Sequence, residues 1–206
     1  MQRREFITLL GGTAAAWPLT VRAQQTAMPV IGYLSSFPAD INPKLTQAFR
    51  EGLNDAGFFE GHNLTIEYRW DEEGRYDRLP MMAADLVGRR VAVLFASPIP
   101  AALAAKAATA TIPIVFAVGS DPVETGLVTS LNRPGGNATG AAFLSVELVS
   151  KRLELLRDLE SEIASVGLLV NPRNPNAAPP TKEMEKETKT LGLRLDTLEA
   201  GAESHF

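Results

Sequence analysis

Cysteine is absent from this chain of 206 residues. Its absence excludes a disulfide framework, a thiolate metal site and a thiol nucleophile. It also excludes a lipid anchor on a cysteine that follows an export signal. Histidine is almost as scarce, since only His62 and His205 occur, and a zinc site or a Ser-His-Asp triad needs more. The scarcity of these residue types disfavours an enzyme, and we predict no metal or cofactor.

The chain also lacks an excess of positive charge, and it lacks a long apolar run outside its N-terminal region. The chain carries 20 basic and 24 acidic residues, a formal net charge of −4, whereas nucleic-acid binding calls for a basic stripe. No segment after the N-terminal region reaches about 18 consecutive apolar residues, the length that crosses a bilayer. We expect a globular protein that binds no nucleic acid and is soluble after export.

The N-terminal region has the three parts of a cleavable export signal. Arg3 and Arg4 form a charged start, residues 6–19 form a short apolar run with two glycines, and residues 21–23 read Val-Arg-Ala. We predict a signal peptide over residues 1–23 with cleavage near Ala23, and a periplasmic location. The arginine pair and the weak apolar run favour twin-arginine export over general secretion.

Strand-like and helix-like segments alternate along the rest of the chain. Continuous apolar strands between amphipathic helices predict an α/β fold, with a parallel sheet covered by helices on both faces. The final residues 199–206 contain no closing element, and only two strands follow residue 145. We therefore expect a complete first unit, a partial second unit and a truncated chain. The predicted strands are 29–34, 63–70, 91–96, 112–118, 138–144, 165–170 and 193–196, and the predicted helices are 43–56, 78–89, 101–109, a short one from Val123, 147–159 and 182–190.

Small polar residues follow four of the predicted strands, at residues 35–37, 97–98, 119–122 and 171–176. Ligands of parallel sheets bind beyond the carboxyl ends of the strands, where helix N-termini favour a carboxylate. The alternative is that each residue only caps the next helix, which stabilises by about 1 kcal/mol. Four such loops together favour a ligand site.

Three other features have a second interpretation each. Residues 71–73, Asp-Glu-Glu, could hold a cation, but the pattern favours a solvated loop. Tyr68 and Trp70 share one strand face and are predicted in the core or at its rim, with an aromatic wall of the ligand site as the alternative. Gly135 and Gly136 precede a strand and predict a turn rather than a phosphate loop.

Many segments resemble, in order, one known protein family over residues 28–198. They include Pro29-Val-Ile-Gly-Tyr-Leu-Ser-Ser36, Ile66-Glu-Tyr-Arg-Trp70, Ala83-Ala-Asp-Leu-Val87, Ile112-Pro-Ile-Val-Phe116, Leu131-Asn-Arg-Pro-Gly-Gly-Asn137 and Lys151-Arg-Leu-Glu-Leu-Leu156. The chain resembles the ABC transporter substrate-binding proteins of the group that includes tryptophan- and tyrosine-binding members.

The resemblance implies a type I periplasmic binding fold, in which two α/β lobes enclose a ligand cleft. Lobe 1 would span residues 28–144 and a partial lobe 2 residues 145–206. The implied partners are a small-molecule ligand, an amino acid or carboxylate, and an ABC permease in the inner membrane. Ser35, Ser36, Ser97 and Asp121 would line the cleft from lobe 1, and Asn174 would line it from lobe 2.

Three alternatives remain open from the sequence. An exported ligand-sensing protein would use the same fold without transport. A non-functional remnant of a binding protein would explain the short second unit. An exported α/β enzyme is disfavoured by the scarcity of catalytic residue types.

Overall fold

The structure is a computed structural model that describes residues 28–41, 43–145, 148–174 and 177–201. The predicted signal peptide, residues 1–23, lies outside the described residues, as does Glu147, the predicted first residue of a helix.

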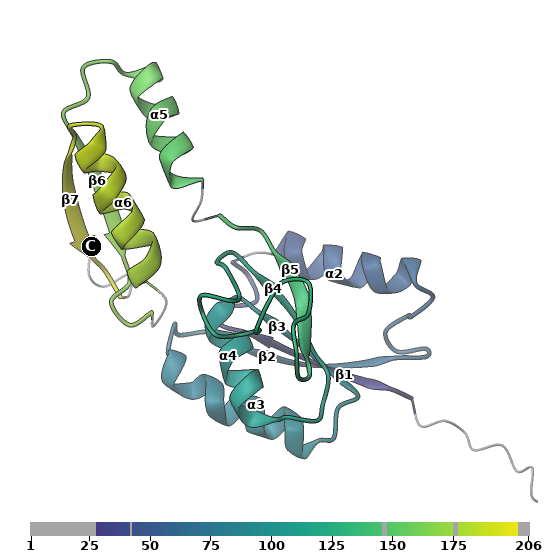
Figure 1. Cartoon of the computed structure of the whole chain (residues 1–206). Coiled ribbons are helices and arrows are strands. Elements are labelled where there is room, and N and C mark those ends of the chain that lie inside the picture. The colour runs from purple at the N-terminus through teal and green to yellow at the C-terminus, as the bar shows by residue number, and fades with distance from the viewer. Residues whose placement is uncertain (1–27, 42, 146–147, 175–176, 202–206) are drawn as a thin grey trace, which may run out of the picture.

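A five-stranded parallel sheet forms the first unit of the fold (Figure 1). Its strand order is β2-β1-β3-β4-β5, and every neighbouring pair is parallel. This confirms the predicted α/β fold with a parallel sheet. The strands are β1 (Val30–Ser35), β2 (Thr65–Trp70), β3 (Val93–Ser97), β4 (Ile114–Val118) and β5 (Ala138–Ala142).

Helices cover both faces of this sheet (Figure 1). Successive side chains of β1 point to opposite faces, so Tyr33 packs with Phe49 of α2, and Leu34 packs in the core that α3 and α4 complete. Both β1 side chains are at most 1% exposed. The helical elements are α2 (Pro43–Asp55), the 3-10 turn η2 (Tyr76–Arg78), α3 (Leu79–Gly88) and α4 (Ile99–Ala108).

Aromatic rings fill the core on the α2 face. The ring of Tyr33 lies 5.2 Å from that of Phe49, 4.7 Å from that of Trp70 and 4.9 Å from that of Phe95. Tyr68 stacks on Trp70 with ring centroids 5.5 Å apart. The predicted core or rim position of Tyr68 and Trp70 is confirmed.

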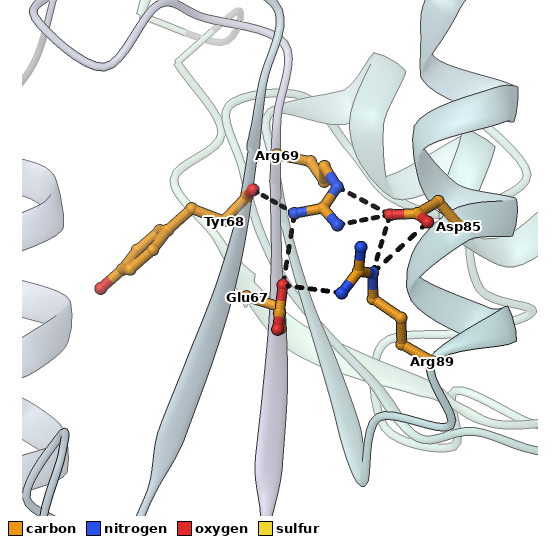
Figure 2. Close-up of polar contacts among 5 residues, drawn as sticks. All are labelled: Glu67, Tyr68, Arg69, Asp85 and Arg89. Carbon is orange, nitrogen blue, oxygen red and sulfur yellow. Dashed lines mark hydrogen bonds and ion pairs between the residues drawn. The ribbon is translucent and has the colours of Figure 1, made fainter.

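An ion-pair network joins the edge strand β2 to α3 (Figure 2). Arg69 donates from Nε to Asp85 Oδ2 over 2.8 Å and also pairs with that oxygen through Nη2. Arg89, at the end of α3, donates to the same oxygen over 3.2 Å, and Glu67 lies 3.5 Å from both arginines. Hydrogen bonding by Arg69 holds the pKa of the Asp85 carboxyl below its usual value.

A second unit follows β5. Its two strands pair in parallel, with Ser165 opposite Arg194. Helix α6 packs against both strands, and α5 packs against α6 (Figure 1). Leu169 and Leu198 are more than half exposed on the same face of this small sheet. The proposed lobe boundaries, 28–144 and 145–206, stay a prediction. The elements are α5 (Val149–Leu159), β6 (Ser165–Val170), α6 (Ala178–Thr190) and β7 (Arg194–Glu199).

Several predicted elements differ from the structure. The helix predicted over 182–190 begins at Ala178, and the strand predicted over 193–196 runs from Arg194 to Glu199. The helix predicted from Val123 is a turn, because the bond from Thr125 N to Asp121 O is followed by Gly126 at φ +72°, which ends the helical path. The strand predicted to reach Leu144 stops at Ala142, since Leu144 adopts φ +46°. Among the helices of the described ranges, none has the length and apolar character to cross a membrane.

Candidate ligand-binding site

Two cavities lie where the carboxyl-terminal loops of the first sheet face the second unit. The smaller has a volume of about 270 Å³ and the larger about 520 Å³, and Ser120 lines both. We call the two cavities together the cleft. The smaller is lined by Phe37, Tyr76, Pro98, Ile99, Pro100, Gly119, Ser120, Ser145, Val149, Arg152, Asn174 and Pro180. The larger is lined by Ser120, Asp121, Glu124, Thr125, Leu144, Ala178, Pro179, Lys182, Glu183 and Lys186.

Two of the five predicted site residues line the cleft directly. Asp121, after β4, lies in the wall of the larger cavity, and Asn174, after β6, lies in the wall of the smaller. The two residues come from different units, as the resemblance implies. Contact of either residue with a ligand stays a prediction.

Asp121 also has a structural role. Its Oδ1 accepts hydrogen bonds from the amides of Val123 over 2.7 Å and Glu124 over 3.4 Å, which caps the turn that follows β4. No described residue donates a hydrogen bond to Oδ2. One carboxylate can therefore cap the turn and still offer an oxygen to the cleft.

The three predicted serines lie behind the cleft wall rather than in it. Ser35 Oγ accepts from the amide of Phe37 over 3.0 Å, and Ser97 Oγ donates to the carbonyl oxygen of Ala117 over 2.7 Å. Ser36 is 2% exposed, and its hydroxyl has no hydrogen-bond partner among the described residues. Phe37 and Pro98, the residues that follow these serines, form the wall instead.

Sequence reasoning missed several cleft residues. Arg152 of α5 lines the smaller cavity, and no carboxylate of the described ranges pairs with its guanidinium. Ser145 also lines it, and its Oγ donates to the carbonyl oxygen of Gly119 over 2.8 Å. Arg152 falls in a helix rather than in a strand-end loop, so the rule that selected the other candidates could not find it. Tyr68 and Trp70 do not line the cleft but a separate cavity of about 490 Å³ beside α2, and their role as an aromatic wall stays a prediction.

Tyr76 forms part of the wall of the smaller cavity and lies close to a buried carboxylate. Burial raises the pKa of its phenol, and the negative charge of Asp71 raises it further. The phenol therefore stays neutral over the physiological range, and its hydroxyl can donate a hydrogen bond.

Asp71 contradicts the prediction that residues 71–73 form a solvated loop. Glu72 and Glu73 are exposed, but Asp71 is 0% exposed, and neither of its carboxylate oxygens has a hydrogen-bond partner among the described residues. It directly follows β2, so the rule that selected the ends of β1, β3 and β4 applies to it equally. The described ranges contain no group of three acidic or histidine side chains that could hold a metal ion.

Comparisons with known proteins agree with this architecture. Residues 39–204 match the family model described as ABC transporter substrate binding protein. A tyrosine-binding protein of Clostridioides difficile (strain R20291) is 33% identical over 135 residues, which are 65% of this chain and 38% of that protein.

Solved structures show the same fold. A conserved domain protein from Vibrio cholerae superposes with a TM-score of 0.77 at 30% identity, over 84% of this chain and 58% of that one. An ABC domain from Streptococcus pneumonia, in complex with L-Trp, gives a TM-score of 0.73 at 22% identity, over 84% of this chain and 57% of that one. This chain thus spans less than two thirds of the length of each of these relatives.

Proposed function

Since this chain belongs to the family of ABC transporter substrate-binding proteins, we propose that it is the solute-binding component of an ABC importer. The family consists of binding proteins and not of enzymes, in agreement with the expectation from residue composition. The proposed ligand is a small organic molecule with a carboxylate, an amino acid above all, and the proposed binding site is the cleft between the two units.

The observation that carries this proposal is the position and chemistry of the cleft. It lies beyond the carboxyl ends of parallel strands, where open α/β sheets bind their ligands. Arg152 offers a guanidinium without an intramolecular partner among the described residues, which suits bidentate binding of a carboxylate. The amino-acid class is further supported by the 33% identical relative, whose name records tyrosine binding.

Export and delivery complete the proposal. The N-terminal arginine pair and the Val-Arg-Ala sequence before Gln24 support secretion to the periplasm. There the two units would close around the ligand by a hinge motion, and the closed form would be recognised by an ABC permease in the inner membrane.

Thermal unfolding of the 206-residue chain against a panel of amino acids and small carboxylates tests the binding function. A ligand at one hundred times its Kd stabilises the folded protein by about 2.7 kcal/mol, so we expect a clear rise in Tm for one chemical class. A cooperative transition that no member of the panel shifts would contradict the proposal.

Substitution of Arg152 tests the site. Arg152→Ala should weaken binding of the active carboxylate at least about tenfold, because a charge-assisted hydrogen bond is worth roughly 1.5–3 kcal/mol. Arg157→Ala removes an exposed arginine of the same helix that does not line the cleft, and it should leave affinity unchanged. Equal affinities of both variants would show that the ligand binds elsewhere.

A further inference from the structure

Asp71 and Ser36 are two buried polar side chains without partners among the described residues. Asp71 is 0% exposed and Ser36 is 2% exposed, and both carboxylate oxygens and the hydroxyl lack a hydrogen bond to any described group. A buried carboxylate that has no cation or donor nearby costs several kcal/mol. At the ligand-binding edge of a sheet, a bound molecule could supply the hydrogen bonds that these two side chains lack within the chain.

Backbone pairing places the two side chains side by side. Ser35 lies opposite Trp70 in the parallel register of β1 and β2, and the amide of Asp71 donates to the carbonyl oxygen of Ser35 over 3.0 Å. Ser36 and Asp71 therefore occupy the next register position. Since paired residues of neighbouring strands face the same side of a sheet, both side chains lie on the face covered by α3 and α4.

A neighbour of each of these two residues lines the smaller cavity of the cleft. The wall of that cavity includes Phe37, which follows Ser36 in the sequence. It also includes Tyr76, whose pKa is raised by burial and further by the charge of Asp71. Phe37 is 43% exposed. The buried pair is thus connected to the space proposed to hold the ligand through Phe37 and Tyr76.

The arginines near Asp71 in the sequence are engaged with other carboxylates. Arg69 pairs with Asp85 and Glu67, Arg75 pairs with Glu73 and Asp77, and Arg78 pairs with Glu73. The negative charge of Asp71 is therefore not neutralised by these three side chains.

We propose that the Asp71 carboxylate, together with Ser36 Oγ, binds the ammonium group of the ligand. This rests on the proposed function and narrows it, because a ligand held by Asp71 and by Arg152 carries both a cation and a carboxylate. A primary ammonium has three N–H donors and satisfies both carboxylate oxygens and the serine hydroxyl. The ligand reaches the pair past the side chains of Phe37 and Tyr76.

Matched ligands with and without the amino group test this assignment. L-tyrosine is compared with 3-(4-hydroxyphenyl)propanoate, and L-tryptophan and L-leucine with their des-amino counterparts, by calorimetry on the 206-residue chain. We expect the unmodified chain to prefer the amino acid. In Asp71→Asn the affinity for the amino acid should fall about 30-fold or more, while that for the des-amino acid stays unchanged.

Two controls separate binding from folding. Asp55→Asn changes an exposed aspartate at the C-terminal end of α2 that does not line the cleft, and it should retain the preference for the amino acid. Without ligand, Asp71→Asn should melt at the same temperature as the unmodified chain or higher, since an unpaired buried charge is removed. If Asp71→Asn does not fold, Ser36→Ala provides the test and should lower the preference several-fold.

The outcomes distinguish this assignment from the function it rests on. If the unmodified chain binds an amino acid and neither Asp71→Asn nor Ser36→Ala lowers its preference over the des-amino acid, the assignment is wrong and the binding function stands. If the unmodified chain prefers the des-amino acid, the assignment is also wrong. If it melts cooperatively and binds neither member of any pair nor any member of the panel of amino acids and small carboxylates, both are overturned.

Discussion

The amide nitrogen of Asp71 donates a hydrogen bond to the carbonyl oxygen of Ser35 over 3.0 Å. This bond continues the pairing of β1 and β2 beyond the last residue of β2. On the other side of β1, the amide of Ser36 donates to the carbonyl oxygen of Ser97 over 3.3 Å. Three strands are thus joined at their carboxyl ends by backbone bonds, so single side chains there can be replaced while the sheet edge persists.

Two serines at this edge should respond differently to truncation. Ser97→Ala removes a 2.7 Å hydrogen bond to the carbonyl oxygen of Ala117, and we expect a loss of about 1 kcal/mol in the free energy of unfolding. Ser36→Ala removes a buried hydroxyl without a partner among the described residues, and we expect no loss or a small gain. Urea unfolding of both variants measures this difference, and a larger loss for Ser36→Ala would contradict it.

Gly140 of β5 has no room for a side chain. A Cβ at this position would collide with the carbonyl oxygen and the ring of Phe116 in the neighbouring strand. We expect Gly140→Ala to lower the free energy of unfolding by about 1–3 kcal/mol, since overpacking shifts backbone as well as side chains.

The matched control is a glycine with open surroundings. A Cβ on Gly52 of α2 would meet nothing within 4 Å, and alanine in a helix interior is favoured over glycine by roughly 0.5–1 kcal/mol. Gly52→Ala should therefore raise Tm while Gly140→Ala lowers it. A rise in both would show that β5 does not pair with β4 as described.

Asp85 should make the stability of the fold depend on acid pH. Arg69 lowers the pKa of this carboxyl in the folded protein, with a smaller contribution from Arg89 (Figure 2). The stabilisation is therefore present above the unfolded pKa of about 3.9 and is lost as pH falls through the lower, folded value. Asp85→Asn should show a shallower fall of Tm below about pH 4 than the unmodified chain.

The control for this pH effect is Asp55→Asn, which changes an exposed aspartate that forms no ion pair with any described residue. This variant should retain the steep fall of Tm at acid pH. Identical pH profiles for Asp85→Asn and the unmodified chain would show that the ion pair does not contribute to folding.

Most of the fold could be predicted from the sequence because the strands are short, continuous apolar runs. The run that became β3 is buried over four of its five residues, so its pattern could only suit a sheet covered on both faces. The turn at residues 121–126 could not be predicted as reliably, since Gly126 at positive φ ends a helical turn that the preceding residues allow. Local composition there is compatible with both outcomes.

The candidate site was harder to predict, because burial at strand ends is decided by distant packing. Charge suggested a solvated loop at residues 71–73, yet Asp71 is fully buried and Leu79, in the first turn of α3, is buried with it. Arg152 enters the cleft only because the first turn of α5 lies near the loops that follow β3 and β4, an arrangement that no local pattern encodes. The principle that ligands bind beyond the carboxyl ends of parallel strands identified the edge of the sheet where the cleft lies, but it did not identify every side chain there.

Asp121 combines two roles that substitutions can separate. Asparagine caps a helical turn as well as aspartate does, whereas alanine loses about 1 kcal/mol. Asp121→Asn should therefore keep the bonds to the amides of Val123 and Glu124 and unfold like the unmodified chain, while Asp121→Ala unfolds more easily.

If the carboxylate also binds the ligand, Asp121→Asn should still lower affinity about tenfold, since a hydrogen bond to a charged group contributes about 1.5 kcal/mol or more. Calorimetry and urea unfolding on the same two variants separate the roles, because a change in affinity without a change in stability can arise only from the carboxylate that faces the larger cavity. Unchanged affinity in Asp121→Asn would assign this residue to the turn alone and leave the larger cavity to Lys182 and Lys186 of α6.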